Sequence, residues 1–162
     1  KGFSMRILYY DIVRNEEAER DLGIEYVGLE KLLGESDFVT LHVSLSSSTH
    51  HLIDETKLRM MKRTACLINT SRGPVVDEKA LYKALKEGWI WAAGLDVWEK
   101  EPAEPSNPLL SLPNVTAAPH IASASYETRT KMAVMAAENL MAILEGKEPP
   151  NLVNKEVLQV KR

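Results

Sequence analysis

Short apolar runs alternate with helix-prone segments along this chain of 162 residues, and this alternation is the feature that most constrains its fold. Apolar runs that end at turn residues predict strands. The predicted strands cover residues 5–10, 37–43, 65–70, 91–98 and 114–120. The predicted helices cover residues 16–22, 29–33, 54–62, 78–88 and 126–144. We therefore expect an α/β fold, a doubly wound parallel sheet whose strands are buried on both faces.

Residues that begin and end helices support these boundaries. Asp54 and Asp77 stand where a capping side chain is expected at a helix N-terminus. Gly23 and Gly34 stand where helices should end.

Trp89 and Trp91 could serve a core or an interface between subunits, and we favour the core.

Composition and charge exclude several classes of protein. The net charge of −3 and the isoelectric point near 5.9 argue against a nucleic-acid partner, which usually selects a basic surface. No apolar stretch approaches the length of a membrane span. Cys66 is the single cysteine, which fits a protein of a reducing compartment, and its side chain is expected to pack as a small apolar group. We expect a soluble cytoplasmic protein, and no residue spacing suggests a metal site.

Polar residues follow the ends of the predicted strands. Asp11 follows the first strand, Arg72 the third, Asp96 lies near the end of the fourth with Glu101 just beyond, and His120 ends the fifth. In a doubly wound sheet, ligands bind beyond the carboxyl ends of the strands. These side chains are therefore expected to converge on one edge and to form a binding or catalytic site.

Asp11 is the first indication of a dinucleotide. A carboxylate at the tip of an early strand usually binds the adenosine ribose 2′-hydroxyl, whereas the nearby Arg14 could accept a 2′-phosphate, so NAD and NADP both remain open. The Gly-x-Gly-x-x-Gly motif of such sites precedes the acid by about 20 residues, a position that falls before Lys1. We expect a Rossmann-like sheet that is incomplete at its N-terminus, in a chain that is a fragment of a larger enzyme.

Arg72 is the candidate anion-binding group, because a planar guanidinium can bind a carboxylate through two hydrogen bonds. Glu99, Glu101 and Glu104 share one loop, and spacing alone does not choose among them. His120 is the histidine at the end of a strand.

The other three histidines have less specific positions. His50 and His51 are expected to face solvent. His42 is expected to be packed or to lie beside a cofactor.

Three motifs give the chain a family resemblance. They are LINTSRGPVVDEKAL at residues 67–81, AAGLDVWEKEP at residues 92–102 and APHIAS at residues 118–123. With them the chain resembles the cofactor-binding half of the D-isomer-specific 2-hydroxyacid dehydrogenases, from residue 5 to about residue 155. The closing EPPNLVNKEV, at residues 148–157, resembles the glyoxylate and hydroxypyruvate reductase branch.

The resemblance implies a role for each candidate residue. The catalytic residues of the family correspond to Arg72, Glu101 and His120. Among the three glutamates of the loop, Glu101 is selected because it directly precedes the proline that ends the second motif. The positions implied to contact the cofactor include these arginine and histidine residues and six others: Asp11, Val43, Thr49, Thr70, Ser71 and Asp96. The implied activity is hydride transfer between NAD(P)H and a small 2-oxoacid, with glyoxylate or hydroxypyruvate as the expected substrate.

The resemblance also implies an organisation. Residues 1–125 are expected to form a nucleotide-binding domain that lacks its first strand and glycine-rich loop. Residues 126–162 are expected to form a helix and tail that cross towards an absent substrate domain. A homodimer is implied for the full-length enzyme. The alternatives are a corepressor-like regulatory protein that binds NAD, and a non-catalytic fragment on the same scaffold.

Overall fold

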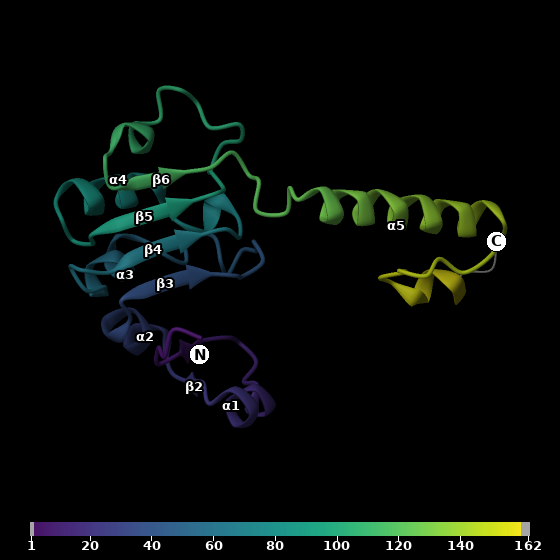
Figure 1. The fold of residues 1–162 in the computed structure, drawn as a ribbon, viewed down its shortest axis with the longest axis horizontal. Coiled ribbons are helices and arrows are strands. Elements are labelled where there is room, and N and C mark those ends of the chain that lie inside the picture. Colours follow the sequence, from purple (N-terminus) through teal and green to yellow (C-terminus); the bar gives the residue numbers. More distant parts are fainter. Residues whose placement is uncertain (1, 160–162) are drawn as a thin grey trace. The chain divides into compact units, whose positions relative to one another are not determined.

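The computed structural model (Figure 1) describes residues 2–159, within a chain that forms two compact units, residues 1–120 and 121–162. All the strands assigned in the described residues belong to the first unit. The strands are β1 (Leu8–Tyr9), β2 (Glu25–Tyr26), β3 (Phe38–Leu41), β4 (Cys66–Asn69), β5 (Ala92–Leu95) and β6 (Val115–Ala117).

The helices follow the strands in alternation. The α-helices are α1 (Glu16–Leu22), α2 (Leu29–Glu35), α3 (Glu55–Met60), α4 (Glu78–Lys86) and α5 (Tyr126–Leu144). Short 3-10 helices are η1 (Gly73–Val75), η2 (Pro108–Ser111) and η3 (Lys155–Gln159).

Four strands form one sheet in the order β3-β4-β5-β6, and every neighbouring pair is parallel. The register places Asn69, the last residue of β4, beside Leu41 and Leu95, the last residues of the neighbouring strands. Strands β1 and β2 form a separate parallel pair. The predicted parallel, Rossmann-like α/β class is confirmed, and the loops after β4, β5 and β6 leave the sheet at one edge.

The strands bury one face rather than the two that were expected. Residues of β3 and β4 alternate between buried and more exposed positions, because successive side chains of a strand point to opposite faces. Leu33, Leu58 and Leu81, from α2, α3 and α4, share one core with the buried side chains of the sheet. These three helices therefore cover the same face.

The predicted helix starts are confirmed at two positions. The side chain of Asp54 accepts a hydrogen bond from the backbone N–H of Lys57 at 2.8 Å, and Asp77 accepts from Lys79 and Ala80 at 3.0 Å each. These bonds satisfy N–H groups that have no partner in the first turn of a helix. Both carboxylates are thereby committed to the fold.

Several local predictions are wrong. Helix α2 continues through Gly34 to Glu35, and β2 was not predicted, because its exposed Glu25–Tyr26 forms no apolar run. His42 lies beyond the end of β3 and is exposed, so it is not packed in the core, and its place beside a cofactor stays a prediction. The side chain of Trp91 is 64% exposed, and it is not a core residue.

The second unit contains α5, with the bounds that the sequence predicts, and a tail that folds back along it. Ser125 caps the helix by accepting from the N–H of Thr128 at 3.1 Å. The side chain of Asn139 donates to Asn151 Oδ1 at 3.1 Å and accepts from the Asn151 N–H at 3.0 Å. No helix within residues 2–159 is both long enough and apolar enough to cross a membrane.

Candidate active site

The loop after β4 presents Arg72 on a fixed backbone. The Asn69 amide accepts from both the N–H and the hydroxyl of Ser71, at 3.1 and 2.9 Å, and donates to the carbonyl of Arg72 at 3.0 Å. Asn69 is buried, so these bonds stabilise the turn from inside the core. The exposed Arg72 side chain uses its Nη1 to donate to the Ser71 carbonyl at 2.6 Å, which leaves other N–H groups of the guanidinium for a ligand.

Gly73 holds this loop against the segment that follows β5. A Cβ atom at Gly73 would lie 1.9 Å from both the carbonyl carbon and the carbonyl oxygen of Trp98. It would also lie 2.4 Å from the backbone nitrogen of Glu99. These distances are far below van der Waals contact, and the neighbouring atoms are backbone, so only glycine fits here. The contact fixes the loop that carries Arg72 relative to the loop that carries Glu101.

Gly73→Ala is therefore expected to lower the free energy of unfolding by about 3 kcal/mol or more, because two backbone segments must separate. Chemical denaturation of the full-length protein measures this change. Gly28→Ala is the matched control, because a Cβ at Gly28 meets nothing within 4 Å. The control should lower the free energy of unfolding by at most about 1 kcal/mol. Equal stability of Gly73→Ala and the wild type would refute the close packing described here.

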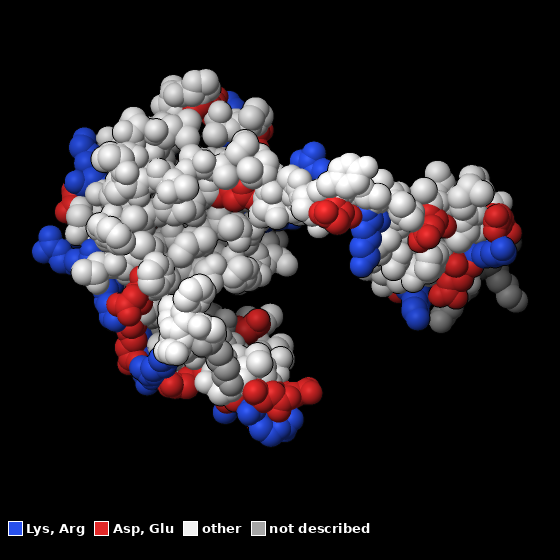
Figure 2. Space-filling model, viewed as in Figure 1, with Lys and Arg blue, Asp and Glu red and all other residues white. Residues whose placement is uncertain are grey.

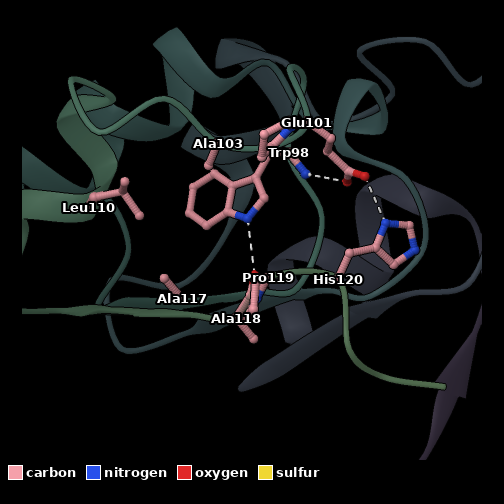
Figure 3. Close-up of a pocket in the computed structure, with 9 residues that line it drawn as sticks. Trp98, Glu101, Ala103, Leu110, Ala117, Ala118, Pro119 and His120 are labelled. Carbon is pink, nitrogen blue, oxygen red and sulfur yellow. Dashed lines mark hydrogen bonds and ion pairs between the residues drawn. The ribbon is translucent and has the colours of Figure 1, made fainter. Parts of the chain in front are cut away.

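Glu101 and His120 form an ion pair between the loops after β5 and β6 (Figure 3). His120 Nδ1 lies 2.7 Å from Glu101 Oε2, and both side chains are partly exposed, at 44% and 36% respectively. His120 has a φ of 57°, in the left-handed region that side chains rarely adopt. This strained backbone directs the imidazole towards the carboxylate.

The surroundings of Glu101 favour its charged form. The hydrogen bond with His120 is the largest cause that lowers the pKa of the Glu101 carboxyl below its ordinary value. Partial burial opposes the shift, while the backbone N–H of Trp98 and the positive charge of Arg72 support it. Glu101 therefore stays ionised at neutral pH, where it can stabilise a protonated His120.

Trp98 connects the two loops that carry this pair. Its backbone N–H donates to Glu101 Oε1 at 3.1 Å, and its indole Nε1 donates to the carbonyl of Ala118 at 3.1 Å (Figure 3). The side chain is only 4% exposed. Trp98 thus positions Glu101 directly and the loop of His120 indirectly.

A second set of hydrogen bonds joins the loop after β5 to the start of α4. The N–H of Glu99 donates to Glu78 Oε1 at 2.6 Å, and the N–H of Glu78 donates to Glu99 Oε1 at 3.0 Å. Asn107 donates to Glu78 Oε2 at 2.8 Å, and His51 Nε2 lies 3.0 Å from Glu99 Oε1. These bonds hold the segment before Glu101 in place.

A hollow of about 560 Å³ lies beside the ion pair. Its walls are mainly apolar, from the loop between β5 and η2, from η2, and from β6 and the segment after it, and the indole of Trp98 lies across it (Figure 3). Glu101 and His120 are among the residues that line it. The charged pair is therefore bordered by apolar surface, which strengthens electrostatic interactions relative to bulk water.

The other residues predicted to contact a cofactor lie just beyond the carboxyl ends of strands. Asp11 lies just beyond β1 and is exposed, and one of its carboxylate oxygens accepts from the N–H of Val13 at 3.3 Å. Thr70 is exposed directly after β4, and Asp96 is buried directly after β5, where its N–H donates to the Asn69 carbonyl at 3.0 Å.

The remaining two residues predicted to contact a cofactor, Val43 and Thr49, lie in the segment after β3. Val43 packs against the core. The hydroxyl of Thr49 donates to the Ser44 carbonyl at 2.6 Å and so closes the loop between them.

The three glutamates of the loop after β5 have different partners. Glu101 faces His120, Glu99 contacts the start of α4, and Glu104 pairs with Lys100. The positioning residues Trp98, Asn69 and Glu99 were not assigned from the sequence. The bonds of Glu99 and of the Trp98 indole join segments that are distant in the chain. The bonds of Asn69 are local, but they depend on the conformation of the loop, which no sequence pattern reveals.

The chain belongs to the family described as D-isomer specific 2-hydroxyacid dehydrogenase, NAD binding domain, which matches residues 1–122. This membership agrees with the parallel sheet and with the polar side chains gathered at its carboxyl edge. The family resemblance stated from the motifs is confirmed.

Among similar proteins, a glyoxylate reductase of Korarchaeum cryptofilum is 66% identical over 161 residues, which cover 99% of this chain and 48% of that protein. A solved structure from Thermus thermophilus has a TM-score of 0.88 and 46% identity over 94% of this chain and 47% of its own. The D-lactate dehydrogenase of Lactobacillus jensenii, solved with NAD+, has a TM-score of 0.84 and 28% identity, over 95% of this chain and 50% of its own. The chain thus spans about half the length of the relatives it matches.

Proposed function

We propose that the full-length protein transfers a hydride between a nicotinamide cofactor and a small 2-oxoacid, with glyoxylate as the principal substrate. The observation that carries the proposal is the 2.7 Å pair of Glu101 and His120, with the charge of Arg72 acting on the same carboxylate. The name of the Korarchaeum cryptofilum relative supports the choice of glyoxylate.

The three side chains have complementary roles in this proposal. Arg72 binds the carboxylate of the 2-oxoacid and polarises its carbonyl group. Protonated His120 delivers its proton to the carbonyl oxygen, and the reverse reaction uses neutral His120 as the base. Glu101 orients the imidazole and stabilises its charged form. Reduction of the carbonyl consumes one hydride and one proton, and it yields the 2-hydroxyacid.

The polar groups at the carboxyl edges of the sheets fit a nicotinamide dinucleotide. Asp11 offers an exposed carboxylate to ribose hydroxyls, and Asp96 would contact the nicotinamide carboxamide. Thr70 and Ser71 would lie beside the nicotinamide ribose.

Two further residues would line the adenine side, and these are Val43 and Thr49. When bound, the reduced cofactor supplies the hydride, while residues of this chain position the substrate and move the proton.

The activity is tested by following NADH oxidation by the full-length protein with glyoxylate, hydroxypyruvate and pyruvate. An aldehyde of similar size that lacks the carboxylate serves as a control, and it should be a poor substrate because Arg72 has no anion to bind. Failure of every 2-oxoacid to oxidise NADH, with the dinucleotide still bound, would favour a regulatory protein that binds NAD.

Glu101→Gln is expected to lower kcat by about tenfold to a hundredfold, because the amide keeps the shape but cannot stabilise a charged imidazole. The pKa of Glu101 is lowered, so the wild-type carboxylate remains ionised as pH falls through the ordinary glutamate range. Loss of this charge should move the alkaline limit of reduction to lower pH. Rate profiles against pH measure both effects.

Glu104→Gln is the matched control, because Glu104 lies in the same loop and pairs with Lys100 at the surface. It should leave both the rate and the profile unchanged. A Glu101→Gln variant with a wild-type profile would contradict the role given to this carboxylate.

We also propose that the full-length enzyme acts in the cytoplasm as a homodimer. The single cysteine, Cys66, supports a reducing compartment, and the exposed Trp91 supplies apolar surface suited to an interface. Light scattering of the full-length protein tests the dimer.

A further inference from the structure

The loop after β1 contains one cation, Arg14. An ion pair with Glu19 of α1 neutralises the charge of this arginine. Arg14 Nε donates to Glu19 Oε1 at 2.8 Å, and Arg14 Nη2 donates to Glu19 Oε2 at 2.7 Å. This is the two-bond geometry in which guanidinium and carboxylate groups pair most strongly. The Glu19 side chain is 18% exposed and that of Arg14 is 55% exposed, so solvent screens the pair from the arginine side only.

Neighbouring groups hold the pair in place. Tyr9 donates its hydroxyl to Glu19 Oε1 at 2.8 Å and accepts from the N–H of Asn15 at 2.8 Å. The guanidinium of Arg14 also lies 5.7 Å from the centre of the Tyr26 ring. These contacts link the loop to α1 and to both strands of the small sheet.

The charge around this loop is otherwise negative. Residues 10–19 contain Arg14 as their one cation and four carboxylates, those of Asp11, Glu16, Glu17 and Glu19. Figure 2 shows acidic and basic side chains side by side in the region of α1. A ribose with a free 2′-hydroxyl tolerates such surroundings, whereas a 2′-phosphate adds about two negative charges and needs an available cation.

We propose that Glu19 is a cofactor-specificity residue, which pairs with Arg14 so that this arginine cannot serve a 2′-phosphate, and that the site therefore selects NAD(H) over NADP(H). The inference rests on the proposed cofactor role of Asp11. Two residues share this selection, because Asp11 repels the phosphate and Glu19 neutralises Arg14, the one cation of residues 10–19.

The pair persists over the working pH range. The hydrogen bond from Arg14 is the largest cause that lowers the pKa of Glu19 to about 2. A lowered carboxyl pKa means that the pairing is complete above the ordinary pKa of glutamate and is lost only as pH falls through about 2. The ion pair between Arg14 and Glu19 should therefore remain formed from neutral to mildly acidic pH.

The test measures equilibrium binding of NADH and NADPH to the full-length protein by the fluorescence of the reduced nicotinamide. The wild type should bind NADH at least about tenfold more tightly than NADPH. Glu19→Gln should shift this ratio towards NADPH by about tenfold, with little change for NADH, because one negative charge is removed beside Arg14. Glu19→Ala should shift it in the same direction, and thermal melting shows whether each variant is folded.

Two further variants assign the effect to the pair. Glu17→Gln removes the same charge from the same helix at an exposed position, and it should leave the ratio nearly unchanged. Arg14→Ala combined with Glu19→Gln should abolish the gain in NADPH binding. An unchanged ratio in folded Glu19 variants, an equal shift in Glu17→Gln, or a wild type that prefers NADPH would overturn the inference but leave the proposed reaction intact. Absence of binding by both dinucleotides would overturn the proposed function and this inference together.

Discussion

His120→Asn is expected to lower kcat for glyoxylate reduction by about 10²–10⁴-fold, because the side chain proposed to protonate the carbonyl oxygen is removed. The dissociation constant for NADH should change far less than kcat, since the substitution removes a proton donor and keeps a side chain of similar shape at a position expected to contact the cofactor. Steady-state kinetics and NADH binding, measured on the same preparation, separate these two expectations.

His50→Asn is the control for this substitution. His50 is exposed and stacks on His51, with ring centroids 4.0 Å apart, and it has no place in the proposed reaction. Its kcat should equal that of the wild type. If the His120→Asn enzyme were active, another group would have to donate the proton. The pair of Glu101 and His120 would then have no role in the reaction.

Arg72→Ala is expected to raise KM for the 2-oxoacid and also to lower kcat, with a combined loss in kcat/KM of about 10²–10⁴-fold. The guanidinium is proposed to contact the carboxylate in the ground state and to polarise the carbonyl in the transition state, so both constants should respond. Arg72→Lys should recover only part of the loss, because an ammonium group cannot form the two parallel hydrogen bonds.

The control for Arg72 is Arg63→Ala. Arg63 lies on the surface and donates to the carbonyl of Gly88 at 3.3 Å. Its removal should leave kcat/KM unchanged. Near-normal kinetics in Arg72→Ala would show that another group binds the substrate carboxylate.

Much of the fold follows from local sequence pattern. Helices α1 and α5 have the predicted bounds, and α1 ends at the predicted Gly23, which adopts the left-handed conformation of a C-cap glycine. The exposed two-residue strand β2 could not be predicted, since its pairing with β1 depends on the parallel neighbour rather than on an apolar run. Trp91 was placed in the core on residue type alone, and type does not decide which side of a strand end faces solvent.

The site was predictable as a set of positions but not as a set of contacts. Parallel strands bring their carboxyl ends to one edge, which is why Arg72 and His120 could be proposed from the residues, and the family motif then selected Glu101. The hydrogen bond of the Trp98 indole and the close approach at Gly73 are long-range contacts between loops. The proposed role of the Arg14 and Glu19 pair decides between two cofactors that the sequence left open.

The most direct test of the central proposal is a single-turnover measurement on the full-length protein, with NADH bound first and glyoxylate added in excess. The proposal predicts that each NADH oxidised gives one glycolate in the wild type. It also predicts that the rate in His120→Asn falls by at least about a hundredfold while NADH remains bound. Wild-type protein that binds NADH but oxidises none of it with glyoxylate, or a His120→Asn variant that reacts at the wild-type rate, would contradict the account.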